Sequence, residues 1–329
     1  MADMTKTQRV MHALKGERVD RVPVSAWWHD FPREWSAADL AETTLEAYRE
    51  YDWDFIKVNP RFSYYSEPWG TEYKPFPDRL PEPVKSAVNG PADLAKIKAV
   101  DGTSGAFAEQ LESLRLIAAG LQSEAPFIQT VFSPLAVMSR ITGPIEPVRA
   151  MIREAPDELD AALTTIGDTL IQYARACLDA GASGIFYAGV EWGSADFISG
   201  KDYDRFSKPH DLRILNAVKD APFNVLHVCR PHNHLMKSLD YPIAAFNWDT
   251  RGEGNPSLQE VLGQTKKAVI GGVDHRRTIR RGGPADVGTE AAEAIEETGG
   301  RRFLLAPNCS IDPATPEANL FALVEAVLA

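Results

Sequence analysis

The sequence has no long apolar run. No stretch approaches the roughly 20 apolar residues that a membrane-spanning helix needs. The opening residues, MADMTKTQRV, also lack the apolar core of a secretion signal. We therefore expect a soluble, cytoplasmic protein that has no membrane partner.

The sequence has fewer basic residues than acidic ones. Lys and Arg total 35 against 46 Asp and Glu, which gives a formal net charge of -11. Such a chain has no general attraction for a phosphate backbone, so we expect no nucleic-acid partner. The sequence also has no Gly-rich nucleotide-binding fingerprint.

Cysteine is scarce as well. The chain has three cysteines, Cys177, Cys229 and Cys309. A small, odd number in a chain of this length argues against a disulfide framework and for reduced thiols. Cys177 continues an apolar stripe with Leu170 and Tyr173 at helical spacing, which predicts core packing. Metal binding or catalysis is left for Cys229 and Cys309.

What the sequence does have is a regular alternation of short β-type runs with segments long enough for helices. The eight runs lie near Val22, Ile56, Ile128, Phe186, Leu226, Phe246, Ile270 and Leu304. Eightfold βα alternation is typical of a closed parallel barrel. The sequence therefore predicts the α/β class, with residues 1–329 forming a single (β/α)8 TIM barrel domain.

Three local features refine this expectation. The proline-rich segment of about residues 60–98 predicts an irregular loop over the barrel mouth. Thr315 and Pro316 predict the N-cap and first residue of the last helix. The Gly271-Gly272 pair predicts a strand approached closely by a neighbour or a ligand.

The main chemical signal is His227-Val228-Cys229 at the end of the fifth run, with Cys309 just past the eighth. Strand alternation places His227 and Cys229 on the same side. In these barrels the carboxyl ends of strands line the active site, so Cys309 can meet them there. One imidazole and two thiolates make a three-ligand zinc set with an open fourth position, although a buried His and Cys without metal is the plainer alternative.

The fourth position has several candidate occupants. Water or substrate is one, and Asp249, Asp274, His232 and His234 are the side chains within sequence reach. Both aspartates also suit local capping roles, and both histidines also suit a solvent-facing loop. Two sulfur ligands favour alkyl transfer to a metal-bound thiol over activation of water.

Aromatic and polar side chains follow the first two runs. Trp28 and His29 end the first, and Asn59, Tyr64 and Glu67 follow the second. Aromatic faces beside a few polar groups suit a large planar cofactor or a small organic substrate. We take these five residues as candidates for cofactor binding, with core packing as the alternative for the tryptophan.

Three stretches of the sequence resemble the uroporphyrinogen decarboxylase superfamily. They are TQRVMHALKGERVDRVPV, the LHVC element, and GGRRFLLAPNCSIDPATPEANLFALVEAV. The resemblance departs from true decarboxylases at three places. AWWHDFPREW replaces their arginine-rich RQAGRY-type segment, Asn59 is near the position of their aspartate, and Cys309 stands where they carry a His.

The His-x-Cys element and the later Cys look like the zinc motif of the methylcobamide:coenzyme M methyltransferase branch. The resemblance implies that His227, Cys229 and Cys309 bind zinc. It also implies that the barrel mouth accepts methylcobalamin, free or on a corrinoid protein, as the donor of a methyl group to a small thiol. Nothing in the sequence identifies that thiol.

Three other functions remain open at this point. A decarboxylase would need cations for substrate carboxylates, for which Arg33, Arg61 and Arg140 are candidates. A cobalamin-independent zinc thiol methyltransferase would keep the metal but use another methyl donor. A non-catalytic tetrapyrrole- or corrinoid-binding protein would bind cofactor without turnover.

Overall fold

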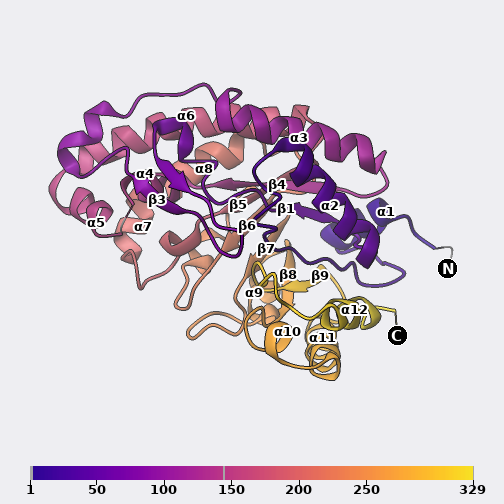
Figure 1. Cartoon of the computed structure of the whole chain (residues 1–329). Helices are drawn as coiled ribbons and strands as arrows, with labels where there is room; N and C mark the ends of the chain where they lie inside the picture. The colour runs from indigo at the N-terminus through magenta and orange to yellow at the C-terminus, as the bar shows by residue number, and fades with distance from the viewer. Residues whose placement is uncertain (1–2, 144, 329) are drawn as a thin grey trace.

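The structure, a computed structural model, describes residues 3–143 and 145–328 and contains a curled parallel sheet (Figure 1). The sheet order is β1-β4-β5-β6-β7-β8-β9, and each neighbouring pair is parallel. The strands are Ile56–Val58 (β1), Phe127–Phe132 (β4), Gly184–Ala188 (β5), Val225–Val228 (β6), Ala245–Trp248 (β7), Ala268–Val273 (β8) and Phe303–Pro307 (β9). Every residue of these strands is buried, as in sheets covered on both faces. The predicted α/β, TIM-barrel-like class is confirmed.

Helices connect the strands and cover the outside of the sheet (Figure 1). The α-helices are Lys6–Lys15 (α1), Ala37–Tyr51 (α2), Gly105–Leu121 (α3), Pro134–Thr142 (α4), Ile145–Glu154 (α5), Pro156–Asp179 (α6), Gly200–Phe206 (α7), Lys208–Ala217 (α8), Leu258–Gln264 (α9), Thr278–Arg281 (α10), Pro284–Thr298 (α11) and Glu317–Glu325 (α12). Short 3-10 turns are Glu67–Trp69, Pro91–Lys96, Val190–Gly193 and Leu235–Ser238. Cys177 lies on α6 and is fully buried in the core, as predicted. Within the described residues, no helix is both long and apolar enough to cross a bilayer.

The run near Val22 does not form the predicted strand. It is an extended segment that forms an isolated parallel bridge from Val24 to Leu305 of β9. Ser25 N donates to Leu305 O at 3.2 Å, and Asp54 N, just before β1, donates to Val24 O at 2.9 Å. Pro23 has no N–H to donate, which limits a regular ladder here. The segment nevertheless fills the gap between β9 and β1 and so closes the ring.

Asp54 ties the closing segment to the rest of the barrel. Its carboxylate has no exposed surface and accepts from Arg9 Nη1 at 2.7 Å, Arg21 Nη1 at 2.5 Å and the backbone N of Val24 at 2.9 Å. Arg9 comes from α1, so this single carboxylate links the first helix, the closing segment and the entry to β1.

The 60–98 segment is more ordered than predicted. Within it, Glu72–Lys74 (β2) and Glu82–Lys85 (β3) form an antiparallel ribbon. Pro83 is tolerated in this ribbon because a two-stranded sheet consists of edges alone. The tip of the ribbon, Asp78 to Leu80, lines the cavity at the barrel mouth.

The last helix begins one residue later than predicted. Pro316 is the N-cap and Glu317 the first helical residue. The hydroxyl of Thr315 donates to Asp312 O at 2.7 Å in a turn that precedes the helix, and no side chain caps the first turn of the helix.

We predict that Asp54→Ala lowers the free energy of unfolding by about 3–5 kcal/mol, because it leaves Arg21 without its carboxylate, leaves Arg9 with Asp20 alone and removes the acceptor for Val24 N. Urea denaturation of the purified variant measures this. The control is Glu112→Ala, which removes an exposed partner of Arg115 and should cost less than about 1 kcal/mol. Equal effects of the two substitutions would contradict the role given to Asp54.

A second buried carboxylate, Asp211 of α8, has no cationic partner among the described residues. It accepts hydrogen bonds from Tyr187 at 2.6 Å and Tyr241 at 2.9 Å. Burial raises the pKa of Asp211 to about 7, against 3.8 for an unperturbed aspartate, and the two tyrosines offset this only in part. The folded protein therefore keeps this proton to a higher pH than the unfolded chain does.

We predict that this group makes the protein less stable as pH rises from about 4 to about 7, by at most about 4 kcal/mol. Stability falls with rising pH because the folded protein binds one more proton than the unfolded chain in this window. Urea denaturation of wild type and Asp211→Asn across the window isolates the effect, since the variant cannot titrate here. A stability difference between the two proteins that does not change with pH would rule it out.

Candidate metal centre

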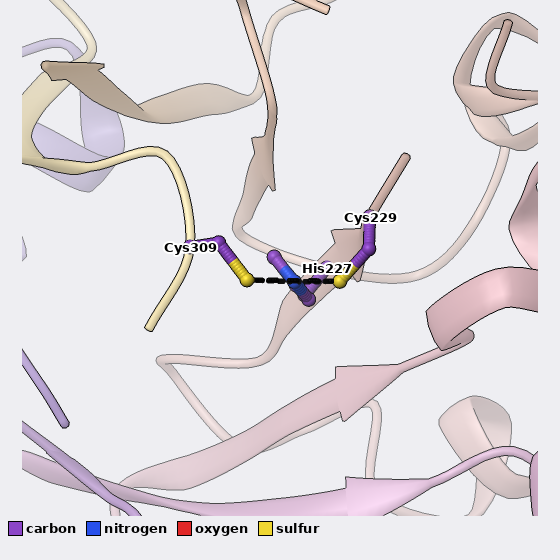
Figure 2. Close-up of side chains that lie close together, drawn as sticks. All are labelled: His227, Cys229 and Cys309. Atoms are coloured by element: carbon purple, nitrogen blue, oxygen red, sulfur yellow. Dashed lines mark hydrogen bonds between the residues drawn. The ribbon is translucent and has the colours of Figure 1, made fainter. Parts of the chain in front are cut away.

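Three potential metal ligands converge at the carboxyl end of the sheet. His227 is in β6, Cys229 follows that strand, and Cys309 lies two residues beyond β9. His227 Nε2 lies 2.7 Å from Cys229 Sγ and 3.5 Å from Cys309 Sγ, and the two sulfurs are 3.7 Å apart. Figure 2 shows the three side chains pointing toward one another, Cys309 approaching from a separate segment. The predicted His–Cys–Cys cluster is thus brought together.

The orientation of His227 is set by the neighbouring strand. The parallel register places it opposite Asn247 of β7, whose Oδ1 lies 2.5 Å from His227 Nδ1. Asn247 Nδ2 donates to Ile270 O on β8 at 2.9 Å, which fixes the amide with its oxygen toward the imidazole. Nδ1 therefore carries the proton, and the lone pair of Nε2 faces the cysteines.

Cys309 is positioned through its neighbour Asn308. Asn308 Oδ1 accepts from Gly272 N at 3.0 Å and from the Thr250 hydroxyl at 3.2 Å. Gly271 has φ 150°, and a Cβ there would lie 2.9 Å from Asn308 Oδ1. Gly272 has φ 112°, and its Cβ would meet a side chain of α11. The predicted close approach at the glycine pair is confirmed, and the approaching groups belong to the protein.

The two thiols differ in their affinity for a proton. The pKa of Cys309 is well below its usual range, chiefly because the Cys229 thiol donates a hydrogen bond to its thiolate. The pKa of Cys229 is raised well above its usual range by the neighbouring Cys309 and by burial. Cys229 therefore holds its proton more tightly than Cys309 does, and a cation that binds both sulfurs would displace that proton.

The donor set fits zinc. A tetrahedral ion with Zn–S bonds near 2.3 Å and Zn–N bonds near 2.0 Å would separate its sulfurs by roughly 3.8 Å and a sulfur from a nitrogen by roughly 3.5 Å. The observed 3.7 Å and 3.5 Å agree with these values. The 2.7 Å between His227 and Cys229 would have to open by about 0.8 Å.

None of the four side chains considered for the fourth position joins the cluster within the described residues. His232 contacts Asp196 at 2.9 Å, and His234 donates from Nε2 to a backbone carbonyl, that of residue 198. Asp274 accepts from two backbone N–H groups of the turn before α10, and Asp249 accepts from one in its own turn. The fourth position is left for water or a ligand.

The cluster opens into a cavity of about 750 Å³ at the barrel mouth, a size that suits a small-molecule or cofactor site. Its lining includes the three donors together with His29, Lys57, Asn59, Phe132, Phe186, His275, Arg276, Arg280, Arg281 and Ser310. Arg280 pairs with Asp312 at 3.0 Å, whereas Arg276 and Arg281 have no carboxylate partner among the described residues. The mouth is therefore basic in a chain that is acidic as a whole.

Two of the five residues proposed for cofactor binding line this cavity, His29 and Asn59. The imidazole of His29 stacks on Phe31 at 5.3 Å and pairs with Glu34 at 2.7 Å. Asn59 Oδ1 accepts from the Ser310 hydroxyl at 3.3 Å, next to Cys309. That His29 and Asn59 bind a cofactor remains a prediction.

The other three lie outside the cavity lining within the described part of the chain. Trp28 packs edge-on against Tyr51 of α2 at 5.9 Å. Tyr64 is fully buried and donates to a backbone carbonyl of β4. Glu67 binds the guanidinium of Arg61 at 2.8 Å. Sequence proximity to a strand end could not distinguish these packing roles from a role at the mouth.

Three residues of the site were not predicted from the sequence: Lys57 and His275, which line the mouth, and the buried Asn247, which binds His227. Asn247 and Lys57 each interrupt an apolar strand with a polar side chain, a signal that was present in AFNW and IKV. His275 follows β8, is buried, and has no partner for Nδ1 within the described residues. Burial lowers the pKa of His275, which favours its neutral form.

Known proteins of two kinds are similar to this chain in sequence. The methylcobamide:CoM methyltransferase of Methanosarcina acetivorans is 24% identical, over 99% of this chain and 98% of the relative. A uroporphyrinogen decarboxylase of Prochlorococcus marinus is 28% identical, over 52% of this chain and 48% of its own length.

Solved structures share the fold. A methyltransferase from Methanosarcina mazei superposes with a TM-score of 0.84 at 24% identity, over 98% of both chains. A B12-independent methionine synthase from Shewanella sp. reaches 0.61 at 13% identity, over 89% of this chain and 87% of that one. The family model described as uroporphyrinogen decarboxylase (URO-D) matches residues 31–329, and the chain therefore belongs to the uroporphyrinogen decarboxylase family.

Proposed function

We propose that this protein is a zinc-dependent methyltransferase that moves a methyl group from a corrinoid, free methylcobalamin or a corrinoid protein, to a small thiol. The observation that carries the proposal is the His227–Cys229–Cys309 cluster, which faces a large cavity and leaves one ligand position open. The full-length similarity to methylcobamide:CoM methyltransferases supports the same reaction class.

The chain's own residues would prepare the site for this reaction. A zinc ion bound there would supply the positive charge that keeps an acceptor thiol as its nucleophilic thiolate near neutral pH. His227, Cys229 and Cys309 would hold it, and Asn247 would keep Nε2 of His227 free for binding. Phe186 stacks on the imidazole at 4.9 Å and, with the barrel walls, would limit water around the thiolate.

The three arginines considered for a decarboxylase give that function no support, although Arg276 and Arg281 of the mouth have no carboxylate partner among the described residues. A decarboxylase needs cations that bind the carboxylates of its substrate. Arg33, Arg61 and Arg140, the three candidates, already bind carboxylates of the protein. Their partners are Glu42 and Glu46 for Arg33, Glu67 and Glu109 for Arg61, and Glu191 for Arg140. The metal cluster would also have no part in such a reaction.

The first prediction from this proposal concerns metal content. We expect about one zinc per chain in freshly purified protein, and less than a tenth of that in Cys229→Ala and Cys309→Ser, because two ligands hold zinc far more weakly than three. Elemental analysis measures the content. Cys177→Ala is the matched control, since it removes the thiol of α6 and should keep the metal.

Activity assays with different methyl donors distinguish the candidate functions. The zinc-loaded protein should demethylate methylcobalamin in the presence of 2-mercaptoethanol, and Cys309→Ser should not. Transfer to the thiol from a methylated folate or sulfur compound, but not from methylcobalamin, would point to the cobalamin-independent alternative. Tight cobalamin binding with no transfer from any donor would indicate a binding protein, and full activity without zinc would refute the proposal.

A further prediction concerns Asn247. Replacement by Leu removes the acceptor for His227 Nδ1, so we expect zinc affinity to fall by about 10- to 100-fold. Asn247→Asp keeps an oxygen acceptor and should lose much less. Competition with a chromophoric chelator measures both, and Asn89→Leu, at an exposed amide that binds Asp93, is the control. Unchanged affinity in Asn247→Leu would show that the strand alone orients the imidazole.

A further inference from the structure

Lys57 is a buried lysine at the floor of the mouth that the proposed reaction has not used. It is the middle residue of β1, its residue surface is 6% exposed, and it lines the same cavity as the three metal donors. Its ammonium donates to Asn59 Oδ1 and lies 4.9 Å from the ring centre of Phe186. Phe186 in turn stacks on His227, so Lys57 and the metal cluster flank the same aromatic ring.

Lys57 makes no salt bridge with a carboxylate within the described residues. Its one hydrogen bond there is to a neutral amide, and its aromatic contacts are to Phe186 and to Trp27 at 6.0 Å. Among the acidic groups, Glu34 faces it, but His29 binds that carboxylate at 2.7 Å. Burial lowers the pKa of Lys57 to about 7, and negative charge at Cys229, Cys309 and Glu34 opposes this shift.

An unpaired buried ammonium is costly unless an anion joins it. A metal centre formed by His227, Cys229 and Cys309 could supply such an anion. Two cysteine thiolates neutralise the two charges of a zinc ion, so a third thiolate at the open position would give the centre one negative charge. Lys57 would carry the single positive charge that balances it, because an anion beside the amine raises the pKa that burial lowers, and water in the cavity screens the attraction only in part.

We propose that Lys57 is the counter-charge for an anionic ligand at the open position of the metal centre, and that it makes this position select a thiolate over a neutral ligand. The inference rests on the proposed function. Arg276 and Arg281 also face the cavity, but they are exposed and therefore well screened.

The same charge assists product release. The carbon–sulfur bond forms from an electron pair of the thiolate, and the pair of the cobalt–carbon bond stays on the corrinoid. The ligand thereby changes from an anion into a neutral thioether. Lys57 attracts the first and not the second, so the centre would hold the acceptor more tightly than the methylated product.

The test compares ligands of different charge on the zinc-loaded protein. Isothermal titration at about pH 7.5 gives the Kd of 2-mercaptoethanol, of azide, an obligate anion, and of imidazole, a mostly neutral zinc ligand at this pH. Lys57→Met keeps the length of the side chain without its charge. We expect it to weaken 2-mercaptoethanol and azide by about tenfold or more and imidazole by less than about twofold. Lys57→Arg, which restores the charge, should recover most of the loss.

Lys267→Met is the matched control. Lys267 also has a pKa lowered by burial and lies 5.9 Å from a phenylalanine ring, that of Phe246, but it precedes β8 at the opposite end of the barrel. It should leave all three affinities unchanged. Equal losses for the three ligands in Lys57→Met, or no loss for either anion, would overturn the role of Lys57. If wild-type protein holds zinc but binds no thiol, the proposed function fails and this inference fails with it.

Discussion

The hydrogen bond between His227 and Asn247 is the contact on which the arrangement of the His227–Cys229–Cys309 cluster depends. It exists because the parallel register of β6, β7 and β8 places His227 opposite Asn247, and Asn247 opposite Ile270. The carbonyl of Ile270 fixes the amide, the amide fixes the imidazole tautomer, and the imidazole presents Nε2 to the two sulfurs. A shift of β6 by one residue in this register would turn the side chain of His227 to the other face of the sheet and break its contact with Asn247.

Cys309 depends on the same principle at the next strand pair. Its neighbour Asn308 reaches back to the amide of Gly272, which the absence of a side chain at Gly271 and Gly272 permits. The cluster is therefore positioned by the register of β6 to β9 and by the side chains of Asn247 and Asn308 that span neighbouring strands. Side chains that approach from loops, such as His232 and His234, are held by other partners and do not reach it.

Charge is distributed unevenly over the molecule, and this bears on what the mouth accepts. The whole chain is acidic, with a formal net charge of -11. The mouth nevertheless combines the buried Lys57 with Arg276 and Arg281, which have no carboxylate partner within the described residues. An anionic ligand and a site of this sign are complementary even though the surface as a whole is not.

The sequence by itself determined the fold class, the grouping of His227, Cys229 and Cys309, and the structural role of Cys177. These follow from local patterns: β-type runs at barrel spacing, His-x-Cys at one strand end, and Cys309 after another. Local patterns also indicated the close approach at Gly271-Gly272. Local patterns did not determine whether the segment near Val22 forms a regular strand. That depends on the backbone N–H and C=O groups that Leu305 and Asp54, both distant in sequence, present to it.

Only the tertiary structure decided which polar residues share the mouth. Trp28, Tyr64 and Glu67 are as close in sequence to strand ends as His29 and Asn59, yet their partners lie elsewhere. Asn247 and Lys57 were recognisable only as polar residues inside apolar strands. Their partners are distant in the chain, and a contact of that kind is fixed by strand register and barrel closure rather than by neighbouring residues.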